Sequence, residues 1–169
     1  MSPSQPLVGQ RRNEKEKINV PLNLKTIESY LLCSPTYIGA IFTKSFKKLL
    51  IKLDSFSMVV HCKFHWFCVY CTKETIEIFD PLGFLQKAKC LGKKFLSFLK
   101  VHINGKTLCC NPKIQSSSSN YCGLYVIFFI KMRDMGYSFR DVLRKFSKKY
   151  RQNDKIVKAY VEKLINVAC

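Results

Sequence analysis

Apolar residues recur at helical spacing in several parts of the chain. Near the start, Leu24, Ile27 and Leu31 fall on one face of a predicted helix. The segment 84–100 returns to the same spacing, with lysines on its remaining surface. The chain after Ser138 is also predicted to be helical, because Ser138 begins a capping box and apolar residues follow at helical period.

Two other segments are dense in β-branched and aromatic residues. They are SMVVHCKFHWFCVYC, residues 57–71, and TIEIFDPLG, residues 75–83, with TKE between them as a turn. We interpret them as two adjacent antiparallel strands. With the flanking helices, they predict an α+β fold in which helices flank a central mixed sheet.

A polar serine run, residues 116–119, leads through Cys122 into an almost wholly apolar segment that stops at Gly136. Its length and its stop favour a buried helix over residues 122–135, although YVIFFI is also rich in strand formers. Cys122 would then lie at the helix N-terminus, where unpaired backbone N–H groups and the helix dipole favour a thiolate over a thiol. The pattern indicates an activated nucleophile.

The chain is long enough for one domain with a hydrophobic core. Of its 169 residues, 47% are hydrophobic. Residues 1–21 are polar and lack periodicity, so we expect a flexible basic arm followed by a single domain over residues 22–169. The N-terminal sequence has no apolar signal core, and no apolar run reaches the roughly 20 residues of a membrane-spanning helix. We expect an intracellular, soluble monomer.

Nine cysteines in a chain without an export signal are more typical of free thiols than of a disulfide framework. Cys68 and Cys71 have the spacing of a metal site. On one strand, however, they would point to opposite faces, and no second pair completes four ligands. We therefore expect no metal.

The formal charge of +18 predicts attraction to nucleic acid or another polyanion. Two basic runs have aromatic residues interleaved, and contacts of this kind would be to phosphates, without sequence preference. The alternative for either run is a solvated helix face. The candidate nucleic-acid-binding residues are Lys44, Lys47, Lys48, Lys52, Arg144, Lys145, Lys148, Lys149 and Arg151.

A thiolate nucleophile needs a base, and the histidines of the chain are His61, His65 and His102. His65 is the candidate, because its strand and the strand that ends in FDP can bring Asp80 beside the imidazole. The carboxylate would fix the ring tautomer and stabilise the imidazolium. His102 is expected in an exposed connection, without a role.

Gln115 precedes the candidate nucleophile by seven residues. Held by the serine loop, its side-chain amide would donate to a developing oxyanion beside the Cys122 backbone N–H. Each residue alone is more typical of a core thiol, a strand histidine with a satisfied ring, or a turn residue. The four roles together, each in its local context, favour a thiol protease site.

Three blocks, FHWFCVYC, IFDPLGF and IQSSSSNYCGLYV, resemble the active-site blocks of the adenovirus-type cysteine protease, adenain, within the clan that includes the SUMO-deconjugating proteases. A fourth, CSPTYIGAIFTKSF, resembles the segment that precedes them, so the similarity runs from about Leu24 to Met135. The Gln-to-Cys interval is like that of adenain. The SUMO proteases usually show one residue fewer and an acidic residue where this chain has Tyr121.

The resemblance implies Cys122 as nucleophile, His65 as general base, Asp80 as orienting acid and Gln115 as oxyanion donor with the Cys122 N–H. Adenain itself commonly has Glu at the position of Asp80. By the same resemblance, Trp66 would pack over the catalytic pair. The loop HCKF before the histidine strand is short, and the His-to-Asp hairpin is two residues tighter than in adenain, which suggests a trimmed substrate cleft.

The resemblance also implies an endopeptidase that cleaves capsid and core precursor proteins of a DNA virus or virus-like element, near small residues such as glycine. Such a protease would act during virion maturation, in the host nucleus and the virion, with DNA as an activator. Adenain is also activated by a short viral peptide that joins an enzyme cysteine by a disulfide. Cys109 and Cys110 lie near that region but out of clear register, so the peptide is not carried over.

Two other functions fit the same residues. A ubiquitin-like-protein protease would use the same chemistry on another substrate. A catalytically inactive, basic DNA-binding protein could retain the fold without the reaction. Cleavage that depends on Cys122 distinguishes an enzyme from the binding protein.

Overall fold

The structure is a computed structural model that describes residues 20–43, 51, 53–83 and 93–165. The helices in this part of the chain are α1 (Leu24–Leu31), α2 (Lys93–Ile103), α3 (Cys122–Asp134), α4 (Phe139–Leu143) and α5 (Tyr150–Ile165). The strands are β1 (Tyr37–Phe42), β2 (Phe56–Cys62), β3 (His65–Cys71), β4 (Thr75–Phe79) and β5 (Thr107–Cys110).

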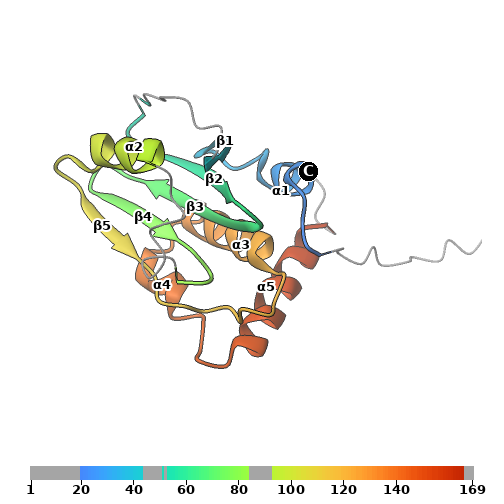
Figure 1. Ribbon diagram of the computed structural model, residues 1–169. Helices are drawn as coiled ribbons and strands as arrows, with labels where there is room; N and C mark the ends of the chain where they lie inside the picture. Colours follow the sequence, from blue (N-terminus) through green and yellow to red (C-terminus); the bar gives the residue numbers. More distant parts are fainter. Residues whose placement is uncertain (1–19, 44–50, 52, 84–92, 166–169) are drawn as a thin grey trace, which may run out of the picture.

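The strands form one sheet in the order β1-β2-β3-β4-β5. The outer pairs, β1 with β2 and β4 with β5, are parallel, and the inner pairs are antiparallel. Helix α2 covers one face of the sheet, and α1, α3 and α5 lie on the other (Figure 1). The predicted α+β fold with a central mixed sheet is confirmed.

The central strand β3 contributes side chains to both layers of the core. Trp66 and Cys68 join the apolar cluster around α3, whereas Phe67 and Cys71 join the cluster beneath α2. This alternation places the two cysteines of the CVYC motif on opposite faces, as predicted. Because both faces of the sheet are covered, β3 is buried after His65 and does not alternate apolar with polar residues.

The prediction of one strand over residues 57–71 is wrong. The segment forms two antiparallel strands, β2 and β3, with Cys62 opposite His65 and a tight turn at Lys63 and Phe64. Lys63 adopts φ +59, in the left-handed region. His61 and His65 therefore lie on different strands, and His61 pairs with Trp66 across the hairpin.

Helix α3 begins at Cys122, as predicted, and is buried on nearly all sides. Its second residue, Gly123, lies against α1 and the segment before it, because an added Cβ would be 3.1 Å from atoms of both Leu22 and Ile27. A larger side chain would push these groups away from the first turn. The Phe129 ring of α3 stacks on Phe79 of β4 with centroids 4.2 Å apart.

The remaining helices agree with the sequence in part. Ser138 caps α4, because its side chain accepts from the Asp141 N–H. The predicted location of His102 in an exposed connection is wrong: it lies in α2, with Nδ1 donating to the Phe98 carbonyl at 2.9 Å. Residues 84–92 of the predicted second helix and residues 1–19 of the predicted arm lie outside the described residues. Within residues 20–43, 51, 53–83 and 93–165, no helix combines the length and apolarity that a membrane span requires.

Candidate active site

His65 and Asp80 meet at one end of the sheet. His65 is the first residue of β3 and Asp80 follows the last residue of β4, so the antiparallel pairing of these strands brings the two side chains together. His65 Nε2 donates to Asp80 Oδ1 at 2.6 Å. The side chain of His65 is 18% exposed and that of Asp80 is 2% exposed, so solvent reaches the ring but hardly the carboxylate.

The turn after β4 orients the carboxylate. The Leu82 N–H donates to Asp80 Oδ1 at 2.8 Å, and the Gly83 N–H donates to the Asp80 carbonyl at 2.9 Å. Gly83 has φ +71, and a Cβ there would come within 2.7 Å of the Lys113 backbone nitrogen, so the turn requires glycine. Asp80 is thus held by its own turn as well as by His65.

Cys122 is the first residue of α3 and is buried. Its thiol lies beside the His65 ring and contributes to raising the pKa of that imidazole. Because Nε2 of the ring donates to Asp80, Nδ1 is the ring atom left for the sulfur. The N-cap residue, Tyr121, makes no side-chain hydrogen bond to the first turn, which leaves backbone N–H groups available to a negative charge at this position.

His65 is polarised by both neighbours. Burial alone would lower the pKa of His65, but hydrogen bonds with Asp80 and Cys122 and the charges of these groups outweigh it and raise the pKa from 6.5 to about 9. The ring is therefore protonated at neutral pH. An imidazolium between a carboxylate and a thiol is the arrangement expected of a nucleophile, a base and an orienting acid.

The raised pKa of His65 makes the free energy of unfolding depend on pH. The folded chain binds this proton more tightly than the unfolded chain, so the stabilisation is fully present below pH 6.5 and is lost as the pH rises through about 9. We expect the difference in unfolding free energy between the native protein and His65→Gln to shrink over this window. Urea unfolding from about pH 6 to about pH 9.5 measures it. A difference that stays constant across the window would contradict the charged pair.

Gln115 is fully buried beside the serine loop. Its Nε2 donates to the Ser119 carbonyl at 2.8 Å and lies 3.2 Å from the Ser119 hydroxyl. Its backbone N–H donates to Pro81 O at 2.9 Å, next to Asp80. The loop thus holds the amide, and an oxyanion could recruit it by replacing the longer contact with the hydroxyl. The role of Gln115 as oxyanion donor stays a prediction.

Comparison with models of protein families found no match, and comparison with curated proteins found none. Among solved structures, the chain is similar to the ASFV pS273R protease, with a TM-score of 0.48 and 14% identity over 80% of this chain and 63% of that one. It therefore spans less than two thirds of that protease. It is also similar to the central domain of Lpg1148 from Legionella pneumophila, with a TM-score of 0.46 and 13% identity over 78% of this chain and 89% of that one. A third similar structure is the SUMO protease Ulp1, with a TM-score of 0.42 and 16% identity over 83% of this chain and 78% of that one. These similarities concern the fold alone.

Trp66 lies in the core cluster that contains Cys122. Its indole N–H donates to the Leu22 carbonyl at 3.1 Å, and its ring lies against His61 with centroids 4.3 Å apart. Phe42 contacts both of these rings edge-on. The packing of Trp66 over the catalytic pair stays a prediction.

The second basic run lies at the surface, in the connection from α4 to α5 and the first turn of α5. Its members Arg144, Lys145, Lys148, Lys149 and Arg151 are all exposed. Arg144 pairs with Asp141 at 3.1 Å, and Lys145 lies over the Tyr137 ring. The first run, Lys44, Lys47, Lys48 and Lys52, lies outside the described residues.

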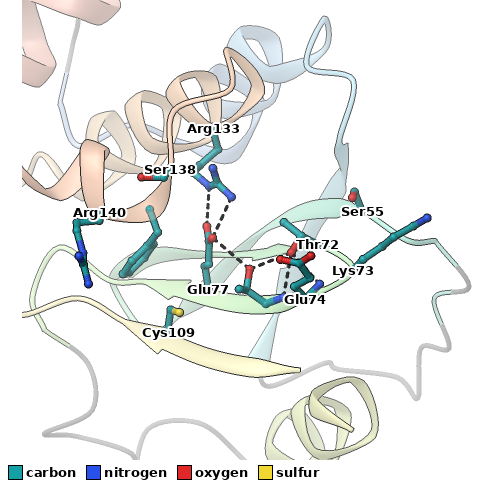
Figure 2. A pocket seen from close by; sticks show the side chains of 11 residues that line it. Ser55, Thr72, Lys73, Glu74, Glu77, Cys109, Arg133, Ser138 and Arg140 are labelled. Atoms are coloured by element: carbon teal, nitrogen blue, oxygen red, sulfur yellow. Dashed lines mark hydrogen bonds and ion pairs between the residues drawn. The ribbon is translucent and has the colours of Figure 1, made fainter. Parts of the chain in front are cut away.

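A pocket of about 640 Å³ lies at the far end of α3 (Figure 2). It contains a buried ion pair in which Arg133 of α3 donates to Glu77 of β4 through Nε at 2.7 Å and Nη2 at 2.9 Å. Burial raises the pKa of Glu77, although Arg133 partly offsets the effect. Arg133 lies eleven positions after Cys122 in α3, about 16 Å along the helix axis. The pocket is therefore separate from the candidate active site.

Proposed function

We propose that this protein is a cysteine endopeptidase. The observation that carries the proposal is the series in which Asp80 accepts a hydrogen bond from His65 and the His65 ring lies beside the Cys122 thiol at the first turn of α3. The series supplies a nucleophile, a proton donor and acceptor, and an orienting carboxylate within one enclosed site.

The reaction begins when the Cys122 thiolate attacks the carbonyl carbon of the scissile peptide bond and the carbonyl electrons move to oxygen. The Cys122 N–H and the Gln115 amide stabilise this oxyanion. As the C–N bond breaks, His65 gives its proton to the leaving amine. Neutral His65 then removes a proton from water, which attacks the thioester, and the C–S bond breaks to release the acid and restore the thiolate.

The test is cleavage by the native protein of a proteome-derived peptide library and of a ubiquitin-like protein with a C-terminal extension. We expect new peptide termini in mass spectra, and none after the protein has been alkylated with iodoacetamide. Cleavage of the ubiquitin-like fusion alone would favour a ubiquitin-like-protein protease. No cleavage of either, with DNA binding retained, would favour the inactive binding protein.

The finer proposal concerns the substrate, and it rests on the resemblance to adenain. The Gln115-to-Cys122 interval is like that of adenain, and Tyr121 stands where the SUMO proteases usually have an acidic residue. We infer capsid or core precursors of a DNA virus or virus-like element as substrates, processed during virion maturation. The host nucleus and the virion are the compartments that this substrate class implies.

DNA is the proposed activator, through the basic run between α4 and α5. The side chain of Asn153 is fully buried and links this run to the active-site segment, because Nδ2 donates to both Ser147 O and Ile114 O at 2.8 Å. Ile114 precedes Gln115 in the chain. A polyanion bound at the run would therefore lie near the segment that carries the proposed oxyanion donor.

Binding of DNA should ignore sequence and weaken with salt. We expect the logarithm of the affinity to fall by about 0.9 per phosphate contact for each tenfold rise in salt. Replacement of all five basic residues of this run by glutamine should reduce the magnitude of the slope by up to about 4.5. Fluorescence anisotropy with a duplex of arbitrary sequence measures the slope.

The control variant carries the same number of glutamines at exposed lysines elsewhere. These positions are Lys25, Lys73, Lys93, Lys100 and Lys163. It has the same net charge, so an equal loss of slope in both variants would assign the binding to overall charge and not to the run.

A further inference from the structure

Asn111 follows β5 and is buried, with 6% of its surface exposed. Its side chain contacts the backbone of Asp80 at two points. The Asp80 N–H donates to Asn111 Oδ1 at 2.7 Å, and Asn111 Nδ2 donates to the Asp80 carbonyl at 2.7 Å. Nδ2 also donates to Pro112 O at 2.8 Å, which fixes the orientation of the amide.

These bonds extend the β4–β5 pairing beyond the point where the strands stop. The last paired residues are Ile78 of β4 and Cys110 of β5. Asp80 lies past this pair, in a buried region where its backbone N–H still needs a partner and its carbonyl accepts from the Gly83 N–H as well as from Asn111. The primary amide of Asn111 has one acceptor oxygen and two donor hydrogens. It therefore accepts from the Asp80 N–H and donates to the Asp80 carbonyl, as the peptide group of a neighbouring strand would.

The contact connects directly to the catalytic series. Asp80 Oδ1, which accepts from His65 Nε2 at 2.6 Å, is carried by the backbone that Asn111 holds. On the other side of this contact, Pro81 O accepts from the N–H groups of Ile114 and Gln115 at 2.9 Å. Asn111 thus begins the set of hydrogen bonds that joins the segment of the orienting acid to the segment of the oxyanion donor.

We propose that Asn111 is a positioning residue for catalysis: its side-chain amide fixes the backbone of Asp80 so that the carboxylate stays on His65 Nε2. This inference rests on the proposed protease function for its kinetic consequence. Its structural consequence, the state of the His65 ring, does not require that the protein cleave anything. A displacement of about 1 Å at a catalytic group is enough to cost about 100-fold in rate.

The first measurement is independent of substrate. We expect Asn111→Ala to shift the NMR titration of His65 from a midpoint of about 9 toward its ordinary value of 6.5, because the carboxylate is no longer held against the ring. The chain has only three histidines, so the signals can be assigned with His61→Gln and His102→Gln.

Asn153→Ala is the matched control. Asn153 is also buried, and it also bridges two segments through both atoms of its amide, but its partners are Ile114 and Ser147 instead of Asp80. A similar shift of the His65 midpoint in this variant would assign the effect to general loosening and overturn the proposal. An unshifted midpoint in Asn111→Ala would also overturn it.

The second measurement is kinetic and uses a peptide found in the cleavage assay. We expect Asn111→Ala to lower kcat about 10- to 100-fold with little change in KM, because Asn111 is buried and holds a group that does not bind substrate. A higher KM with an unchanged kcat would overturn the positioning role. If the native protein cleaves nothing, the titration still decides the role of Asn111, and only the protease function fails.

Asn111→Asp is a second test of the positioning role, for use if Asn111→Ala does not fold. It has nearly the same shape and retains an acceptor for the Asp80 N–H, but a carboxylate cannot donate to the two carbonyls. We expect iodoacetamide to alkylate Cys122 at least severalfold more slowly in this variant at neutral pH. A native alkylation rate would show that Asn111 only fills space.

Discussion

The Cys122→Ala variant will keep the fold and lose peptide-bond cleavage. The loss should be on the order of 10⁴-fold or more, because no other group in the series can form the covalent intermediate. The side chain of Cys122 is small, and its replacement by alanine leaves the apolar contacts of α3 in place. Cleavage rates and the circular dichroism spectrum, compared with those of the native protein, test both parts.

The same assignment predicts which thiol reacts first. Limiting iodoacetamide at neutral pH should label Cys122 ahead of the other cysteines. Among the cysteines in the described part of the chain, it is the one that combines a helix N-terminus with a neighbouring imidazolium. Burial raises the pKa of Cys68 and Cys109, and raises that of Cys110 to about 11, which leaves these thiols less reactive. Peptide mapping that finds Cys109 labelled and Cys122 inert would contradict the nucleophile assignment.

Asp80→Asn should lower kcat on the order of 10³- to 10⁴-fold while the protein stays folded. An amide keeps the shape of the carboxylate but removes the charge, and it favours the wrong tautomer of His65. Loss of the charge and of the carboxylate hydrogen bond also lowers the pKa of His65, so the alkaline limb of the rate profile should move to lower pH. A pH series of kcat and KM measures both effects.

Asp134→Asn is the control for Asp80→Asn. Asp134 accepts from Thr36 and Tyr70 at the far end of α3, away from His65. This variant loses a partly buried carboxylate of the same size, so it should show the cost in stability without the loss of kcat. Rates near native in Asp80→Asn, or equal losses in both variants, would show that the carboxylate is not the orienting group.

Much of this arrangement could be predicted because local patterns and tertiary structure agree. The apolar run that starts at Cys122 has a clear stop at Gly136, and the helix has no polar face to obscure its burial. The pairing of His65 with Asp80 followed from two strands joined by a short turn, TKE. In both cases the residues that indicate the element are close together in the sequence, and the tertiary packing agrees with their local preference.

The errors arose where local signals were weak or absent. The β2–β3 turn at Lys63 and Phe64 contains no glycine, proline, asparagine or aspartate, so the run of strand formers seemed continuous. His102 donates to Phe98 within α2 and accepts from the Ile51 N–H, and the second contact depends on how α2 packs. Asn111, between Cys110 and Pro112, reads as an ordinary turn residue. Only the parallel pairing of β5 with β4 places it against Asp80.

The nearly complete burial of α3 has a consequence for how the site can open. Local fluctuations expose segments with few buried contacts at low free-energy cost, whereas elements at the centre of a core open only with the whole domain. Cys122 begins the element that packs against the sheet, α1 and α5. Exchange of the hydrogen-bonded amides in the central turns of α3 with solvent should therefore require nearly the full free energy of global unfolding. The proposed nucleophile would thus be held by a highly stable part of the molecule, and changes in substrate access would come from the surrounding loops.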